Sequence, residues 1–146
     1  MAVLRMDNIL IVVNDLEAVV AFFTELGLEV EGRTTVEGEW VDRVIGLDGA
    51  RSEIVMMRTP DGNGRLELDR FITPQPVRAE PEDVPVNALG IRRIMFAVDD
   101  IDDLVARLQA RGTELMGEVM QYEDQYRLCY VRGPEGIMVG LAEEIG

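Results

Sequence analysis

Apolar and polar positions follow the same order twice along the chain, with an offset of 85 residues that carries Ile9 onto Ile94. Each copy opens with a β-rich apolar run, at residues 9–13 and 94–98, which predicts a strand. An apolar stripe at helical spacing follows, and it predicts an amphipathic helix with one face on a sheet. The stripes are Leu16, Val19, Val20 and Phe23 in the first copy and Ile101, Leu104, Val105 and Leu108 in the second. Repetition at a fixed offset indicates one structural unit that occurs twice.

The two predicted helices carry matching signals at their ends. Asp15 and Asp100 stand directly before the stripes, where a carboxylate can accept hydrogen bonds from the first amides of a helix. Gly27 and Gly112 stand where the stripes end, and glycine readily takes the positive φ of a helix C-terminus. Both helices are therefore expected to begin and end at equivalent positions of the repeat.

Three further strands are predicted in each copy, at residues 28–36, 51–57 and 65–71 and at residues 113–121, 125–132 and 137–141. Turn signals at residues 59–64 and 133–136 separate the later strands. The pattern predicts an α+β fold with two tandem β-α-β-β-β modules that form a curved mixed sheet around a cleft. Neither module could cover its sheet alone, so the two are expected to pair.

The predicted modules span residues 1–72 and 89–146, with a linker at residues 73–88, and together they form one structural domain. The linker prediction depends on a stretch that holds four prolines and several acids. The acidic run at residues 80–83 belongs to this linker and carries no predicted chemistry.

Composition narrows the classes of function. The chain has 146 residues and no apolar run of the roughly 18 residues that a membrane-spanning helix needs, so a soluble protein is expected. A single cysteine excludes an intrachain disulfide and fits the reducing cytoplasm, so a cytoplasmic protein is expected. The formal charge of −14 argues against nucleic-acid binding, which needs a basic surface. The absence of histidine removes the commonest metal ligand and the usual proton-transfer group near neutral pH. The single cysteine, Cys129, is expected to be a small buried apolar residue rather than a nucleophile.

Four stretches cover most of the chain and carry a family resemblance. They are DNILIVVNDLEAVVAFFTELGLE, PDGNGRLEL, IRRIMFAVDDIDDLVARLQARG and YVRGPEGIMVGLAEE. In these stretches the chain resembles the glyoxalase, bleomycin-resistance and extradiol-dioxygenase superfamily, also called vicinal oxygen chelate proteins. The resemblance implies the tandem fold, a small organic ligand in the central cleft and a homodimer.

Metal-dependent members of that superfamily hold their ion with four ligands, one on the first and one on the last strand of each module. The resemblance maps these positions onto Asn8, Glu67, Arg93 and Gly140. Only Glu67 keeps a proper ligand type, because Gly140 has no side chain and Arg93 places a permanent positive charge where the cation should be. We therefore expect no metal ion and no other cofactor.

Two interpretations of these central residues remain open. Arg93 could pair with Glu67 and neutralise a carboxylate that is costly to bury, which is a structural role. Alternatively, Asn8 and Arg93 hold a carboxylate, phosphate or enolate oxygen of a ligand, with Glu67 as the proton acceptor.

Further ligand-binding candidates lie in the loop-rich stretch of residues 37–44 and on strands of the second module. Trp40 and Arg43 could form a lid or a ligand shelf, although Trp40 is equally suited to the core or to a dimer interface. The candidates in the second module are Tyr122, Tyr126, Arg127 and Tyr130, for which ordinary packing is the alternative.

The residues favour a metal-independent protein that binds a small organic ligand. The alternative is a metal-independent isomerase, lyase or cyclase with Glu67 as base and Arg93 as oxyanion partner. A metal-dependent lyase or dioxygenase is less favoured, because two-histidine iron chemistry cannot be built without histidine. Whether the chain is an enzyme stays open at this point.

Overall fold

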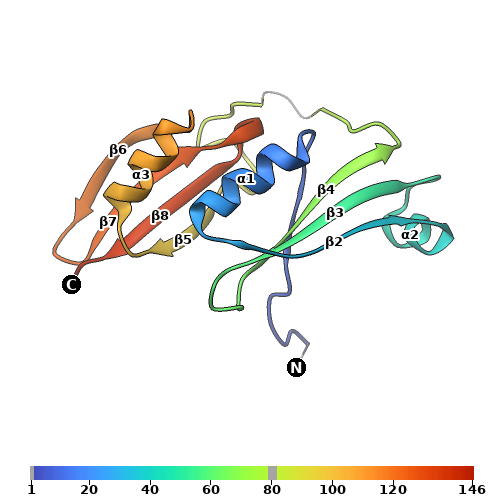
Figure 1. The fold of residues 1–146 in the computed structure, drawn as a ribbon, viewed down its shortest axis with the longest axis horizontal. Helices are drawn as coiled ribbons and strands as arrows, with labels where there is room; N and C mark the ends of the chain where they lie inside the picture. Colours follow the sequence, from blue (N-terminus) through green and yellow to red (C-terminus); the bar gives the residue numbers. More distant parts are fainter. Residues whose placement is uncertain (1, 79–81) are drawn as a thin grey trace. The chain divides into compact units, whose positions relative to one another are not determined.

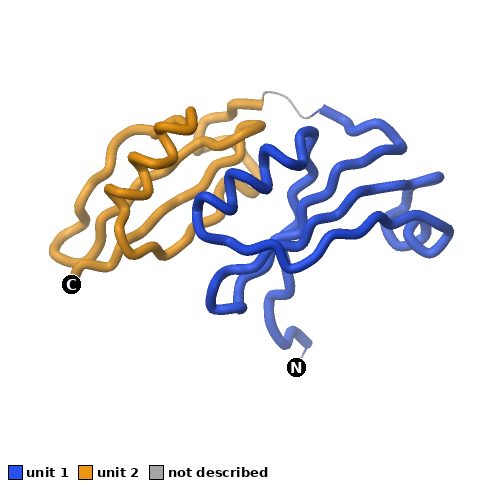
Figure 2. The backbone as a smooth tube through the Cα atoms, viewed as in Figure 1, with its two compact units in different colours: residues 1–78 blue, residues 79–146 orange. Residues whose placement is uncertain are grey.

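A computed structural model describes residues 2–78 and 82–146 of the chain. Residues 79–81 of the predicted linker, which include the first two residues of its acidic run, lie outside the described residues. The chain forms two compact units, residues 1–78 and 79–146, which are distinguished by colour in Figure 2.

The first unit is a four-stranded mixed sheet with two helices (Figure 1). In chain order its elements are β1 (Ile9–Val12), α1 (Leu16–Leu26), β2 (Glu29–Glu37), α2 (Glu39–Ile45), β3 (Arg51–Arg58) and β4 (Arg65–Thr73). The strand order is β1-β4-β3-β2, and β1 runs parallel to β4 while the other neighbours are antiparallel.

The second unit repeats this topology without a counterpart of α2. Its elements are β5 (Ile94–Val98), α3 (Ile101–Ala110), β6 (Glu114–Tyr122), β7 (Tyr126–Arg132), the 3₁₀ turn η1 (Pro134–Gly136) and β8 (Met138–Glu144). The strand order β5-β8-β7-β6, with β5 parallel to β8, matches that of the first unit. The predicted α+β fold of tandem β-α-β-β-β modules is thus confirmed, and each module has its own mixed sheet.

Both predicted helix N-termini and the C-terminus of α1 form as the capping signals predicted. In contrast, α3 ends one position earlier than predicted, at Ala110 with Arg111 as its cap at φ −94°, and Gly112 follows at φ 93°. The Asp15 carboxylate accepts a hydrogen bond from the Ala18 amide at 3.1 Å, and the Asp100 carboxylate accepts one from the Asp103 amide at 3.1 Å. Gly27 ends α1 in the left-handed conformation, at φ 114°. Such caps satisfy amides and carbonyls that the helix itself leaves free.

The core of each unit lies between its long helix and one face of its sheet. The residues of both predicted stripes are buried, with Phe23 and Ile101 fully inaccessible to solvent. On β4, Leu66 and Leu68 are buried on the face that α1 covers, and alternation places Glu67 on the opposite face. Burying one large apolar side chain contributes about 1.5–3 kcal/mol, so these stripes hold each helix on its sheet. Among the described residues, no helix has the length and apolar character needed to span a membrane.

The expectation of a loop at residues 37–44 was wrong, because this stretch forms most of α2. Val41 is the buried residue of this helix. The Asp42 carboxylate accepts hydrogen bonds from the amides of Gly49 and Ala50 at 3.0 and 2.8 Å. These contacts come from the following loop, so they stabilise a short helix whose own sequence signal is weak.

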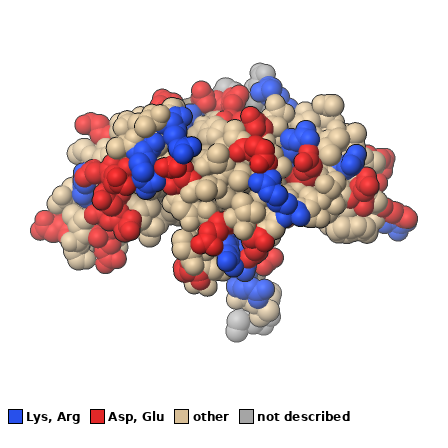
Figure 3. Space-filling model, in the orientation of Figure 1, with Lys and Arg blue, Asp and Glu red and all other residues tan. Residues whose placement is uncertain are grey.

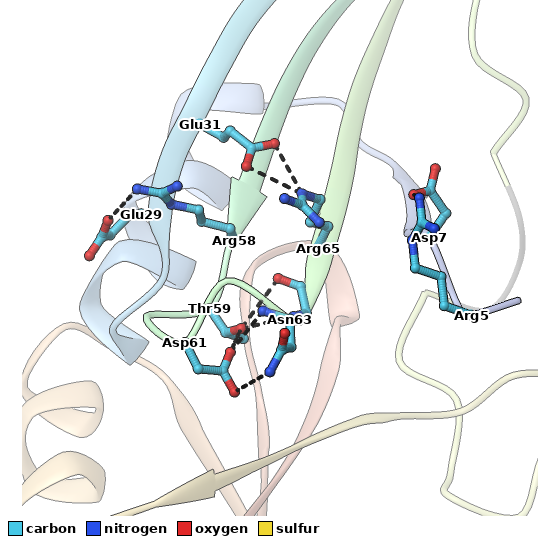
Figure 4. A network of polar contacts seen from close by, with 10 residues as sticks. Arg5, Asp7, Glu29, Glu31, Arg58, Thr59, Asp61, Asn63 and Arg65 are labelled. Carbon is cyan, nitrogen blue, oxygen red and sulfur yellow. Dashed lines mark hydrogen bonds and ion pairs between the residues drawn. The ribbon is translucent and has the colours of Figure 1, made fainter.

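The predicted turn at residues 59–64 joins β3 to β4 and is held by side-chain and backbone hydrogen bonds (Figure 4). The Asp61 carboxylate accepts a hydrogen bond from the Asn63 amide at 3.0 Å, and the Thr59 amide donates to the Gly64 carbonyl at 2.8 Å. The ion pair between Arg65 and Glu31, with an N···O distance of 3.2 Å, links the neighbouring strands beside this turn. The turn therefore fixes the register in which β4 presents its side chains.

Candidate functional site

Two predicted residues of the first unit, Asn8 and Glu67, lie at the strand pair β1 and β4 of the first sheet. Asn8 directly precedes β1, and Leu10, two residues later, is the register partner of Glu67 on the neighbouring strand β4. Leu10 is 50% exposed, and Glu67 is half-buried. The register thus brings a carboxylate and an accessible apolar side chain together, with Asn8 at the start of the same strand pair.

Asp69 lies two residues beyond Glu67 on the same face, and sequence reasoning missed it. Its side chain is only 6% exposed, and its Oδ1 accepts no hydrogen bond from any residue that the structure describes. Burial, followed by the hydrogen bond with Glu67 and the charge of that carboxylate, raises the pKa of Asp69 to about 8. At neutral pH the Asp69 carboxyl group is therefore largely protonated. The alternation Leu-Glu-Leu-Asp at residues 66–69 was the available signal.

In the second unit, Arg93 lies across the face of the sheet opposite α3. Its Nε donates a hydrogen bond to the Tyr130 hydroxyl at 2.6 Å, and its Cζ lies 5.6 Å from the centre of the Tyr130 ring. A Cβ atom at Gly140 would lie 3.2 Å from Arg93 Cδ and 3.1 Å from Met95 Cε. The missing side chain at Gly140 therefore leaves the space that Arg93 occupies.

The positive charge of Arg93 has an unusual environment for this chain. Most arginines pair with carboxylates, and Figure 3 shows basic and acidic side chains next to one another over the face that it draws. The paired arginines include Arg33, Arg43, Arg58, Arg65, Arg70, Arg107, Arg127 and Arg132. Among the described residues of the second unit, no carboxylate pairs with Arg93. Its guanidinium binds a neutral hydroxyl instead, so its charge is left without a counter-ion within that unit.

An apolar hollow of about 370 Å³ adjoins Tyr130. Val86, Met116 and Leu128 contribute its apolar walls. The hollow lies where β6 bulges away from β7, because the register between these strands shifts between Met116 and Met120 and Gly117 takes a φ of 66°. Glycine accommodates that conformation at little cost, so the bulge is built into the sequence.

The other predicted residues of the second unit lie apart from this hollow. Tyr122 and Tyr126 flank the turn between β6 and β7 and are 57% and 39% exposed. Arg127 forms an ion pair with Asp102 of α3, which directs its side chain toward the helix-covered face of the sheet. Tyr130 is therefore the predicted residue that the structure joins to Arg93.

Trp40 and Arg43 lie on α2 of the first unit. Trp40 is 64% exposed, so it does not belong to the core. Arg43 pairs with Glu39 one turn earlier, at 2.6 Å. Their contact with a ligand stays a prediction, as does the meeting of Asn8 and Glu67 with Arg93 and Gly140 in one cleft.

Comparison with known proteins identifies the family. The model of the Glyoxalase/Bleomycin resistance protein/Dioxygenase superfamily matches residues 5–141. The chain belongs to this superfamily. The crystal structure of a glyoxalase family protein from Bacillus cereus is 57% identical in sequence and matches with a TM-score of 0.95, covering 100% of this chain and 99% of that one. No curated protein sequence matches this chain.

More distant superfamily structures show the same fold. The trypanothione-dependent glyoxalase I of Leishmania major is 19% identical, with a TM-score of 0.67 over 97% of this chain and 87% of that one. The fosfomycin resistance protein FosX of Listeria monocytogenes is 15% identical, with a TM-score of 0.64 over 99% of this chain and 94% of that one. The fold therefore occurs in proteins with different chemistry, and the side chains of this chain must decide its own.

The residues that the resemblance maps onto the superfamily's metal-ligand positions do not fit a metal ion. In the second unit, Arg93 fills the space beside Gly140, so one position supplies a cation and the other supplies no donor atom. Among residues 2–78 and 82–146, no group of three or more acidic or cysteine side chains is arranged to hold an ion.

Proposed function

We propose that this chain is a small-molecule-binding member of the superfamily that holds an organic ligand without the metal ion of its metal-dependent relatives. The observation that carries this proposal is the position of Arg93, which lies over Gly140 and bonds to Tyr130. A guanidinium at this place repels a divalent cation and can bind an oxyanion directly.

Apolar surface beside these polar groups supports the same function. In the first unit, Leu10 and Val12 are 50% and 48% exposed on the strand next to Glu67. In the second unit, the hollow beside Tyr130 has apolar walls. Small-molecule sites combine predominantly apolar walls with a few well-placed polar groups, and both sheets offer that combination.

Ligand binding by chelator-treated protein tests the proposal. A panel of small aromatic acids, amines and amides is added to the treated protein, and the midpoint of thermal unfolding is measured for each. A ligand that binds the folded state raises this midpoint. We expect at least one compound to do so to the same extent with and without added divalent metal. A panel in which every stabilisation depends on added metal would contradict the proposal.

A second candidate function is metal-independent catalysis, as in an isomerase, lyase or cyclase. The carboxyl pair on β4 favours it, because Glu67 can accept a proton while the raised pKa keeps Asp69 protonated as a donor. A buried carboxyl group with a raised pKa beside a second carboxyl group is typical of acid–base sites. The role of Arg93 as the oxyanion partner stays a prediction.

The variant Glu67→Gln separates binding from catalysis. It keeps the size of the side chain but removes the proton acceptor, so an enzyme would lose turnover of a bound compound while keeping its affinity. A pure binding protein would convert no compound, and the substitution would alter affinity alone. Asp48→Asn, at an exposed aspartate after α2, serves as the matched control.

The resemblance also implies a homodimer, and we include it in the proposal. Light scattering on the purified protein measures the mass directly. A mass equal to that of one chain would contradict this part of the proposal.

A further inference from the structure

We propose that the face of the second sheet opposite α3 binds an organic anion, with its apolar body in the hollow beside β6 and its oxyanion on Arg93. This inference rests on the proposed binding function and names the chemical class of the ligand.

The hollow has the size and chemistry of a site for a small apolar body. Its volume of about 370 Å³ lies near the lower end of the roughly 300–1,000 Å³ typical of ligand pockets. Met116 contributes a flexible, polarisable wall that adapts to flat ring systems. A ligand of one or two rings therefore matches the space.

The sheet register brings the positive charge to the rim of this hollow. Met95, Gly140, Tyr130 and Met116 are successive register partners across β5, β8, β7 and β6. The Arg93 side chain follows this row, passes the position where Gly140 lacks a side chain, and ends at Tyr130. Since Tyr130 and Met116 also line the hollow, the guanidinium and the apolar walls belong to one surface.

The N–H donors of Arg93 that no described residue of the second unit accepts favour an oxyanion as the ligand group. A guanidinium has five N–H donors, and the Nε donor is the one that Tyr130 accepts. No carboxylate among the described residues of the second unit uses the others. A carboxylate ligand can accept two of these donors side by side, which is the strongest arrangement for this pair of groups.

The negative charge of Glu118 favours one orientation of the bound ligand. Glu118 lies on the bulge of β6 and is the charged residue among those that line the hollow. Its negative charge disfavours an anionic group near β6, whereas Arg93 reaches the hollow from the side of β5 and β8. An anion therefore binds with its charged end toward Arg93 and its rings toward β6.

Three matched probes test the ligand class: 2-naphthoate, its neutral amide 2-naphthamide, and the cation 2-naphthylmethylammonium. Each is titrated into the full chain, and dissociation constants are measured from amide NMR shifts. We expect naphthoate to bind more tightly than the amide, and the amide more tightly than the cation. Shifts should be largest for Met116, Leu128 and Tyr130. The opposite order of affinities, or shifts confined to the first unit, would overturn the proposal.

Variants separate the Arg93 contact from general charge effects. Arg93→Gln should lower the affinity for naphthoate about tenfold, as expected for the loss of a charged hydrogen bond. The affinity of this variant for naphthamide should stay within about twofold of the wild-type value. Arg107→Gln removes the same charge from α3, on the other face of the sheet, and should change neither affinity. Glu118→Gln should raise the affinity for naphthoate and leave the affinity for naphthamide unchanged. Equal losses in Arg93→Gln and Arg107→Gln would overturn the specific role of Arg93.

Failure of this inference can be distinguished from failure of the proposed function. If other organic compounds stabilise the chelator-treated protein and Arg93→Gln binds naphthoate as well as the wild type does, the anion site is wrong and the binding function stands. If no organic compound binds at all, both are wrong. The Arg93 side chain is exposed, so Arg93→Gln is expected to fold, and its circular dichroism spectrum checks this.

Discussion

The buried carboxyl of Asp69 makes a sharp prediction about how the stability of the protein changes with pH. The pKa of this group is about 8 in the folded state, against 3.8 as the ordinary value for aspartate. Between these two values the folded protein binds a proton that the unfolded chain has released, so the free energy of unfolding falls as pH rises. The stabilisation that the Asp69 proton provides is complete below the pKa of Asp69 in the unfolded chain. It is lost as the pH rises through the pKa of Asp69 in the folded protein.

The size of this loss follows from the same two values. One pH unit inside the window corresponds to about 1.4 kcal/mol, so raising the pH from about 5.5 to about 9 removes up to about 3 kcal/mol. The chain has no histidine, which would otherwise titrate in this range. A variant without this carboxyl group separates the effect of Asp69 from that of the Cys129 thiol and the other groups that titrate toward alkaline pH.

Urea unfolding of the wild type and of Asp69→Asn across this pH range measures the effect. Asparagine has a similar shape and a donor for Glu67 but no titrating proton, so its free energy of unfolding should not show this loss. At the alkaline end the variant should be more stable than the wild type by up to about 3 kcal/mol. Asp48→Asn, at an exposed position, should follow the wild-type curve. Parallel curves for the wild type and Asp69→Asn would refute the assignment of the raised pKa to Asp69.

Three other substitutions or reagents probe separate parts of the structure. Asp15→Ala removes the cap of the Ala18 amide and should lower the free energy of unfolding by about 1 kcal/mol in urea titrations, and an unchanged midpoint would contradict the capping role. Burial raises the pKa of the Cys129 thiol, so a thiol-specific disulfide reagent should react with it slowly in the folded protein and rapidly in urea; equal rates would show that the side chain is accessible. Gly140→Glu places a carboxylate beside Arg93 and should weaken naphthoate binding about tenfold in the NMR titration, whereas unchanged affinity would show that Arg93 does not hold the anion.

The fold could be predicted because its determinants are local and occur twice. The helical stripes, Asp15 and Asp100 as caps, and the turn at residues 59–64 each depend on a few neighbouring residues, and all agree with one topology. The helix α2 escaped prediction because it has seven residues, and contacts from the next loop to Asp42 stabilise it. Such tertiary contacts leave little periodicity in the sequence.

The candidate site was predictable only in part, for a related physical reason. The family resemblance pointed to Asn8 and Glu67, which the structure brings to one pair of neighbouring strands, and it marked Arg93 as a departure from the superfamily's metal ligands. The titration of Asp69 depends on burial, which the alternation of side chains along a strand does not reveal. The hollow depends on the bulge at Gly117, which no pattern of apolar positions indicates.

Elemental analysis of the purified protein, before and after dialysis against zinc, nickel, manganese and iron salts, most directly tests whether Arg93 has replaced the metal ion. We predict a substoichiometric content of every metal, with no change in the Glu67→Gln variant, because a guanidinium and a glycine stand at two of the four positions that the resemblance assigns to metal ligands. One equivalent of a transition metal that is lost in Glu67→Gln would contradict this account of the site.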